Sequence, residues 1–139
     1  MNRTAELVEK WIAKAERDFV TASTILDKIP DFDDVICYHC QQAAEKYIKA
    51  YLICLNIDFG KIHSLTELVK KISNRPDYDK RLNGLVEGYE GFAVDVRYPE
   101  IIDKALPKPD EVLMTTIKIK EILLPLIRIE LKKLNESTK

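Results

Sequence analysis

The chain has 139 residues, of which 22 are Lys or Arg and 23 are Asp or Glu, so its formal charge at pH 7 is −1. A balanced charge gives no general attraction to nucleic acid or membranes, so any such binding needs a local patch of charge. Hydrophobic residues make up 46% of the chain, and only four Gly and six Pro are present. This composition excludes a disordered or turn-rich all-β protein and favours one helical domain over residues 1–139.

Charge spacing and cysteine content predict a cytoplasmic protein. The longest stretch without Asp, Glu, Lys or Arg runs from Val35 to Ala44, whereas a membrane-spanning helix needs about 20 apolar residues. Charged residues also interrupt the first turns, which argues against a secretory signal. The chain has an odd number of cysteines within one periodic segment, which is typical of buried thiols in a reducing compartment. These are Cys37, Cys40 and Cys54.

The first helix is predicted over residues 5–28, with Thr4 as its N-cap and Pro30 ending it. Apolar residues recur at alternating spacings of four and three, which places them on one helix face. They are Val8, Ile12, Ala15, Phe19, Ala22, Leu26 and Ile29, and Leu7 and Trp11 widen this buried stripe.

A second helix is predicted to begin at Asp33 or Asp34 and to carry two adjacent apolar stripes. The residues of these stripes are Ile36, Cys40, Ala43, Tyr47, Tyr51 and Cys54, and then Cys37, Ala44, Ile48 and Leu55. So broad an apolar arc is typical of a central helix that contacts more than one neighbour. The remaining residues form one continuous polar arc, predicted to lie at the surface. They are Gln41, Glu45, Lys49, Gln42, Lys46 and His39, with Tyr38 in the middle.

The segment after residue 63 is predicted to form a short helix and then a long one. The run from Ser64 to Glu67 reads as a capping box, which opens a short helix that ends before Pro76. Spacings of four and three from Tyr78 onward predict a helix that runs to about Arg97.

Three glycines on one side of that long helix, Gly84, Gly88 and Gly91, each cost about 1 kcal/mol relative to Ala. They indicate either local flexibility or the close approach of another backbone, from this chain or from a partner.

The last helix is predicted to open with Pro109 in its first turn, followed by two acidic residues. Its buried face is expected to consist of Leu113, Ile117, Leu124, Ile127, Leu131 and Leu134. The predicted fold is therefore all-α: an antiparallel up-and-down helical bundle of four long helices plus one short helix.

Four motifs, taken in chain order, resemble one family. The second helix carries His39-x-Gln41-Gln42-Ala43-Ala44-Glu45-Lys46, and the stretch from Trp11 to Asp18 precedes it with an A-x-x-D core. His63-Ser64-Leu65 and Arg97-Tyr98-Pro99 follow. In these residues the sequence resembles the HEPN family, the higher eukaryotes and prokaryotes nucleotide-binding domain, from about Trp11 to Pro99.

The resemblance implies an all-α bundle that commonly forms homodimers and whose work is connected with nucleotides or RNA. Many relatives are toxins paired with a small nucleotidyltransferase antitoxin. The catalytically active RNases of the family are similar in using an Arg followed after four to six residues by a His. Counted from Arg97, the permitted positions hold Ile102, Asp103 and Lys104, and both histidines of this chain precede Arg97.

The missing histidine bears on chemistry, because metal-free RNA cleavage needs a group of near-neutral pKa to move the 2′-hydroxyl proton. Arg97 remains a phosphate-contact candidate, since a guanidinium can hold two phosphate oxygens at once. It is equally a candidate for a helix C-terminal cation paired with Asp95 or with a carboxylate of a partner. Candidates for a displaced acid or base include His63, Asp103 and Lys104.

The other candidate residues fall into two groups. Nucleotide or phosphate binding is predicted for Arg97, Tyr98, Lys46 and His39, and an interface with a partner is predicted for Tyr38, Gln42, Gly84 and Gly88. Cys37-x-x-Cys40 has no second Cys/His pair at matching spacing, which favours buried packing over a zinc site. No metal and no cofactor is expected.

The leading hypothesis is a HEPN-like module that forms a homodimer and associates with a nucleotidyltransferase-type partner, as in a toxin–antitoxin pair. A competing hypothesis is a metal-independent ribonuclease toxin that uses Arg97 with a displaced acid or base. A nucleotide-binding regulator is the third.

Overall fold

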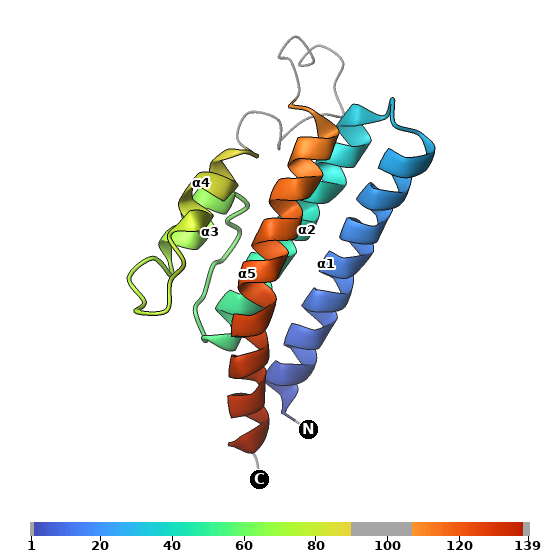
Figure 1. Ribbon diagram of the computed structural model, residues 1–139. Helices are drawn as coiled ribbons and strands as arrows, with labels where there is room; N and C mark the ends of the chain where they lie inside the picture. Colours follow the sequence, from blue (N-terminus) through green and yellow to red (C-terminus); the bar gives the residue numbers. More distant parts are fainter. Residues whose placement is uncertain (1, 90–106, 138–139) are drawn as a thin grey trace.

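The computed structural model describes residues 2–89 and 107–137, and in these residues it contains five helices and no strand (Figure 1). They are α1 (Arg3–Lys28), α2 (Asp33–Cys54), α3 (Leu65–Lys70), α4 (Arg81–Glu87) and α5 (Pro109–Glu136). The predicted all-α helical bundle is confirmed. In these residues α1, α2 and α5 are long and α3 and α4 are short, and the predicted fourth long helix extends into residues 90–97, which lie outside the described ranges.

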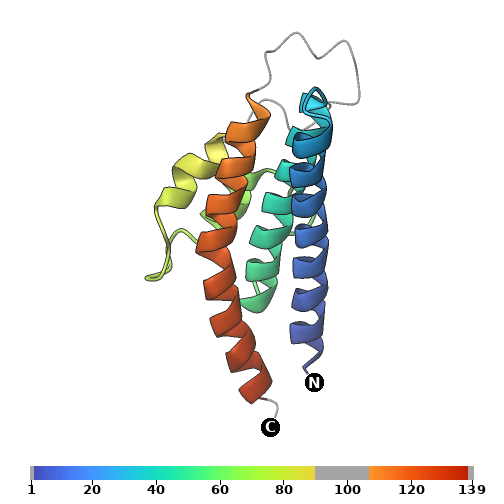
Figure 2. The same cartoon turned by 45° about the vertical axis from the view of Figure 1, so that its right-hand side comes forward.

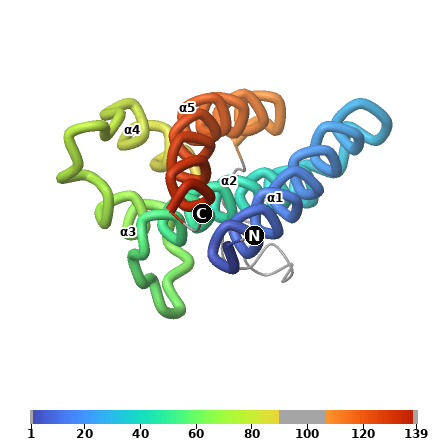
Figure 3. Tube along the Cα trace, turned by 90° about the horizontal axis from the view of Figure 1, so that it is seen from below, coloured from blue at the N-terminus to red at the C-terminus, as the bar shows by residue number. Residues whose placement is uncertain are grey.

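The three long helices lie side by side with α2 in the middle (Figures 1 and 2). α1 and α2 form an antiparallel hairpin, and α3 and α4 carry the chain back so that α5 runs in the same direction as α2. Seen from the end of the bundle, α3 and α4 lie on the side away from α1 (Figure 3). The two ends of the described chain meet, because the Asn2 amide donates to the Leu134 carbonyl at 3.4 Å.

The helix predicted from Tyr78 to about Arg97 is much shorter where it is described. α4 ends at Glu87, and the next two backbone N–H groups, of Gly88 and Tyr89, bond to carbonyls only three residues back, each at 3.2 Å. Such tight bonds are typical of a closing helical turn. Two glycines within five residues lower the helix propensity by about 2 kcal/mol, which explains the early end. The segment 90–97 lies outside the described residues.

α1 begins earlier than predicted, at Arg3, because the Asn2 side chain rather than Thr4 caps it and accepts from the Ala5 N–H at 3.0 Å. The predicted stripe is correct in its middle and wrong at both ends. Leu7 is 46% exposed although Ala5 and Val8 beside it are buried, because it lies on another side of α1, and Ile29 is 45% exposed just after the helix ends.

The central position predicted for α2 is confirmed, because its apolar side chains are buried almost all round the helix. Fully burying a side chain such as Ile48 or Leu52 contributes roughly 1.5–3 kcal/mol. The surface position predicted for the polar arc is wrong for Gln41, Glu45 and Lys49, which are only 3%, 5% and 4% exposed.

α5 begins at Pro109 as predicted, but its buried face is shifted. The buried residues are Val112, Thr116, Ile119, Leu123, Ile127 and Leu131, so four of the six predicted positions are only half-buried. The shift follows from Thr116, whose hydroxyl bonds to the Tyr89 hydroxyl at 2.6 Å and donates to the Val112 carbonyl at 2.9 Å. A satisfied hydroxyl can be buried at little cost.

The capping role predicted for Ser64 is confirmed, since its hydroxyl accepts from the Glu67 N–H at 3.3 Å at the start of α3. None of the helices in the described ranges combines the length and the apolar character that crossing a bilayer requires.

Candidate functional site

One strip of side chains is the only part of α2 between Ile36 and Leu52 that reaches solvent. It consists of Tyr38, His39, Gln42 and Lys46, and every other residue in that range is buried. We call these four residues the α2 window. They are the same four residues of this helix that the sequence singles out for phosphate binding or for an interface.

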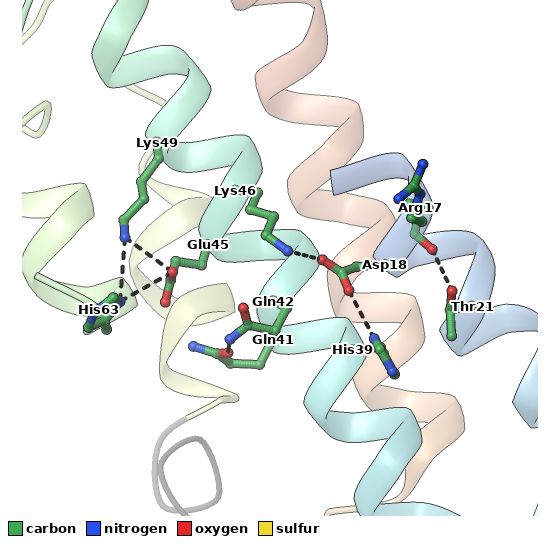
Figure 4. Close-up of polar contacts among 10 residues, drawn as sticks. All are labelled: Arg17, Asp18, Thr21, His39, Gln41, Gln42, Glu45, Lys46, Lys49 and His63. Atoms are coloured by element: carbon green, nitrogen blue, oxygen red, sulfur yellow. Dashed lines mark hydrogen bonds and ion pairs between the residues drawn. The ribbon is translucent and has the colours of Figure 1, made fainter. Parts of the chain in front are cut away.

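A buried carboxylate on α1 lies beneath the window. Asp18 is 9% exposed, and its Oδ1 is 2.9 Å from Nδ1 of His39, while its Oδ2 accepts a hydrogen bond from the Lys46 ammonium (Figure 4). In a neutral imidazole, a carboxylate at Nδ1 favours the tautomer that carries the proton on Nδ1. Nε2 is then the hydrogen-bond acceptor of the ring. His39 and Lys46 are therefore brought together, both held by one aspartate.

The remaining two window residues have different surroundings. The Tyr38 ring is 40% exposed and meets the His39 ring edge-on, with centroids 5.3 Å apart and an interplanar angle of 76°. The Gln42 amide donates to Gln41 Oε1 at 2.8 Å. Tyr38 thus offers an aromatic surface to solvent, as an interface or a stacking contact requires.

A second polar cluster lies farther along α2, where Glu45 and Lys49 are buried and His63 is exposed. Lys49 Nζ is 3.2 Å from Glu45 Oε2, and Nδ1 of His63 is 3.4 Å from each of these atoms (Figure 4). The ammonium also faces the rings of Phe59 and Trp11, 5.0 and 5.9 Å from their centroids. A buried ammonium with a carboxylate and two aromatic faces is well compensated.

The electrostatics of the polar arc follow from these pairings. Lys46 is neutralised by Asp18 and Lys49 by Glu45, so neither lysine is a free cation. A phosphate at the window would therefore add to an ion pair rather than meet an isolated charge. His63 belongs to the second cluster, and its side chain is 73% exposed.

The predicted candidates after α4 cannot be placed against these clusters. Arg97 and Tyr98, like Asp103 and Lys104, lie outside the described residues.

The predicted glycine interface is only partly packed within the chain. Among the described residues, nothing lies within 4 Å of a Cβ built on Gly84, and one on Gly88 would lie 3.8 Å from Cγ2 of Thr115 on α5. No described backbone of this chain therefore approaches Gly84 closely. Contact with a partner there stays a prediction.

The cysteines are buried free thiols, as their place on the apolar stripes predicts. Burial, helped by the neighbouring Cys40, raises the pKa of Cys37 to about 12, and burial raises that of Cys40 to about 11. Thiols held this strongly in the protonated form are poor metal ligands. Among the residues that the structure describes, no three metal-ligating side chains converge.

Two features of the site escape a reading of the sequence. Asp18 belongs to the matched A-x-x-D motif, but only the fold reveals that it joins His39 to Lys46. Glu16 accepts from the Tyr47 hydroxyl and pairs with Lys120 at 2.9 Å, which ties α1, α2 and α5 together. An acidic residue beside an apolar stripe is the one signal that could have drawn attention to either.

These features define a helical bundle whose central helix presents one exposed polar strip backed by a buried aspartate. Residues 8–129 match the family model described as the HEPN domain, which covers most of the chain. The chain therefore belongs to the HEPN domain family.

The comparison with solved structures supports the same fold. The crystal structure of TT1696 from Thermus thermophilus is similar, with a TM-score of 0.69 and 20% identity over 94% of this chain and 99% of that chain. At that identity the likeness concerns the fold alone. No match was found among curated proteins.

Proposed function

We propose that this protein is a homodimeric interaction module that binds a nucleotide or RNA. We further propose that it works with a separate nucleotidyltransferase-type protein, in a toxin–antitoxin-like pair. Membership of the HEPN family supports this proposal, because many relatives work in such pairs. The α2 window is the observation that carries it.

The window is suited to recognition rather than to core packing. Between Ile36 and Leu52, α2 is otherwise buried and exposes a tyrosine, a histidine, a glutamine and a lysine, all of which can bond to a partner. Asp18 holds two of these side chains in place before any ligand arrives, which lowers the entropy lost on binding. Tyrosine is among the residues most enriched where binding energy concentrates.

A non-catalytic role is supported by the position of the histidines. Active HEPN ribonucleases carry their histidine after the arginine, whereas the last histidine of this chain is His63. Arg97 and Tyr98 remain proposed nucleotide contacts in this scheme, together with His39 and Lys46.

The test combines oligomeric state with partner capture. Light scattering on the purified chain is expected to give twice the 16.1 kDa mass, and the tagged chain is expected to retain a nucleotidyltransferase identified by mass spectrometry. Gly84→Glu places a charge at the exposed predicted interface outside the α2 window and should weaken one of these two associations. Asn74→Glu adds the same charge at another exposed position and is the matched control. A monomer that captures no nucleotidyltransferase would refute the proposal.

A metal-independent ribonuclease is the second candidate, and the His39–Asp18 pair is the observation that favours it. A carboxylate that orients an imidazole through Nδ1 is the arrangement that lets Nε2 transfer a proton. A labelled RNA pool incubated with the protein in EDTA distinguishes the two roles. Cleavage that is lost in Arg97→Ala and in His39→Ala would establish the enzyme, whereas intact RNA supports the binding module.

A further inference from the structure

The charges of α1 are sorted between two sides of the helix. Three of its acidic residues bond to cations on the other two long helices, whereas Asp27 in the last turn pairs with Lys28 of α1 itself. Glu9 pairs with Arg128 at 2.7 Å, Glu16 with Lys120 at 2.9 Å, and Asp18 with Lys46. These carboxylates are therefore neutralised from outside the helix.

Three basic residues in the first two thirds of the same helix have no such compensation. Lys10, Lys14 and Arg17 are exposed and follow one another at spacings of four and three, which aligns them along one face. None of the three forms an ion pair with any residue in the described ranges. We call these residues the basic row. Glu6, one turn before Lys10, offsets only its N-terminal end.

The basic row lies next to the site, on a side of α1 that no other described helix covers. Of the described helices, only α2 and α5 pack against α1. Arg17 precedes Asp18 in the chain, and Lys14 lies one turn before Asp18 on the helix, so the row runs beside the α2 window. In Figure 4 the Arg17 side chain points away from the Asp18 carboxylate, whereas the His39 ring bonds to that carboxylate.

We propose that the basic row binds the phosphate backbone of single-stranded RNA, and that the Tyr38 ring stacks on a base of the same strand. This inference rests on the proposed function and names its ligand. Unpaired cations along a helix and an exposed aromatic ring are the two elements by which proteins hold single strands. The Tyr38 ring meets the His39 ring, and His39 bonds to Asp18, which follows Arg17 in the chain. The exposed ring favours RNA over an acidic protein surface, which would need the charges alone.

The affinity for a labelled oligouridine of about 12 nucleotides tests the proposal, measured by anisotropy in EDTA. The triple variant Lys10→Gln/Lys14→Gln/Arg17→Gln removes three phosphate contacts. For single strands each contact contributes about 0.7 to the salt slope, so the slope falls by about 2 and binding weakens about 100-fold at 0.1 M salt. Tyr38→Ser should weaken binding about tenfold with an unchanged slope.

A charge-matched control separates the row from net charge. Lys80→Gln/Lys118→Gln/Lys132→Gln also removes three exposed cations that lack ion pairs in the described structure, and it should leave affinity and slope unchanged. Circular dichroism checks that both triple variants are folded. Equal losses in both variants would overturn the proposal, because they would show a general effect of charge.

Two further arms separate this inference from the function on which it rests. If the basic-row variant binds like the unmodified protein while Arg97→Ala loses binding, the row is refuted and the nucleotide-binding module stands. An oligoglutamate peptide of matched charge, bound as tightly as the RNA and equally dependent on the row, would refute RNA in favour of an acidic protein partner.

Discussion

Replacing Glu45 with Ala is expected to leave the Lys49 ammonium buried without its counter-ion. The two side chains are 7% and 5% exposed, and their charged atoms are 3.2 Å apart. Removing one member of a buried pair costs about 3–5 kcal/mol. The rings of Phe59 and Trp11 remain and compensate the charge by about 1–2 kcal/mol. We therefore expect a loss near the lower end of the range, about 3 kcal/mol.

Urea unfolding at neutral pH measures this loss, with the fluorescence of Trp11, the chain's single tryptophan, as the signal. For a chain of this size the free energy of unfolding falls by about 2 kcal/mol per molar urea, so the midpoint should fall by about 1.5 M. His63→Ala is the matched control and should barely move the midpoint, since its side chain is 73% exposed.

The double variant Glu45→Leu/Lys49→Met tests the cause. It removes both charges and keeps most of the volume, so stability should return to within about 1 kcal/mol of the unmodified protein. The difference between the single and double variants isolates the cost of the orphaned ammonium. A double variant that is as unstable as Glu45→Ala would refute the reasoning, because the loss would then come from packing.

Three further predictions concern other parts of the fold. Asp18→Asn removes the charge that holds His39 and Lys46, so the free energy of unfolding should fall by about 2 kcal/mol. Thermal unfolding measures this fall, and an unchanged melting temperature would mean that the charge does not stabilise the fold. Ser64→Ala removes the cap of α3 and should cost about 1 kcal/mol in the same assay, whereas an unchanged melting temperature would mean that the cap is dispensable. Burial raises the pKa of three thiols, to about 12 for Cys37, about 11 for Cys40 and about 12 for Cys54, from an ordinary value near 9. The unfolded chain loses these protons first, so urea midpoints should fall as the pH rises above about 9, and a flat profile would contradict the burial.

The long helices could be predicted because their positions follow from spacing alone. α1 has the predicted extent within two residues and α2 begins at a predicted residue, since apolar side chains at helical spacing must share a face whatever packs against it. The central place of α2 follows in the same way from the breadth of its apolar arc. The early end of α4 could not be read from its apolar residues, because glycines at 84 and 88 lower helix propensity without disturbing the apolar pattern.

The burial of the polar arc could not be predicted, because periodicity says which residues share a face and not what covers it. Lys49 is covered by Trp11, which belongs to α1, and by Phe59, in the loop after α2. The path of that loop leaves no periodic signal. The same limit applies to Asp18, whose two partners lie 21 and 28 residues farther along the chain.

The net charge of −1 conceals a local surplus that only the pairings reveal. A charge total counts every carboxylate of α1 against every cation of α1, as if they faced one another. In the fold, Glu16 faces Lys120 and Asp18 faces Lys46, so these carboxylates cancel cations of other helices. Lys14 and Arg17 then keep their charge on the open side. Composition therefore excludes a general attraction to nucleic acid, while the bundle itself creates the local patch that such binding requires.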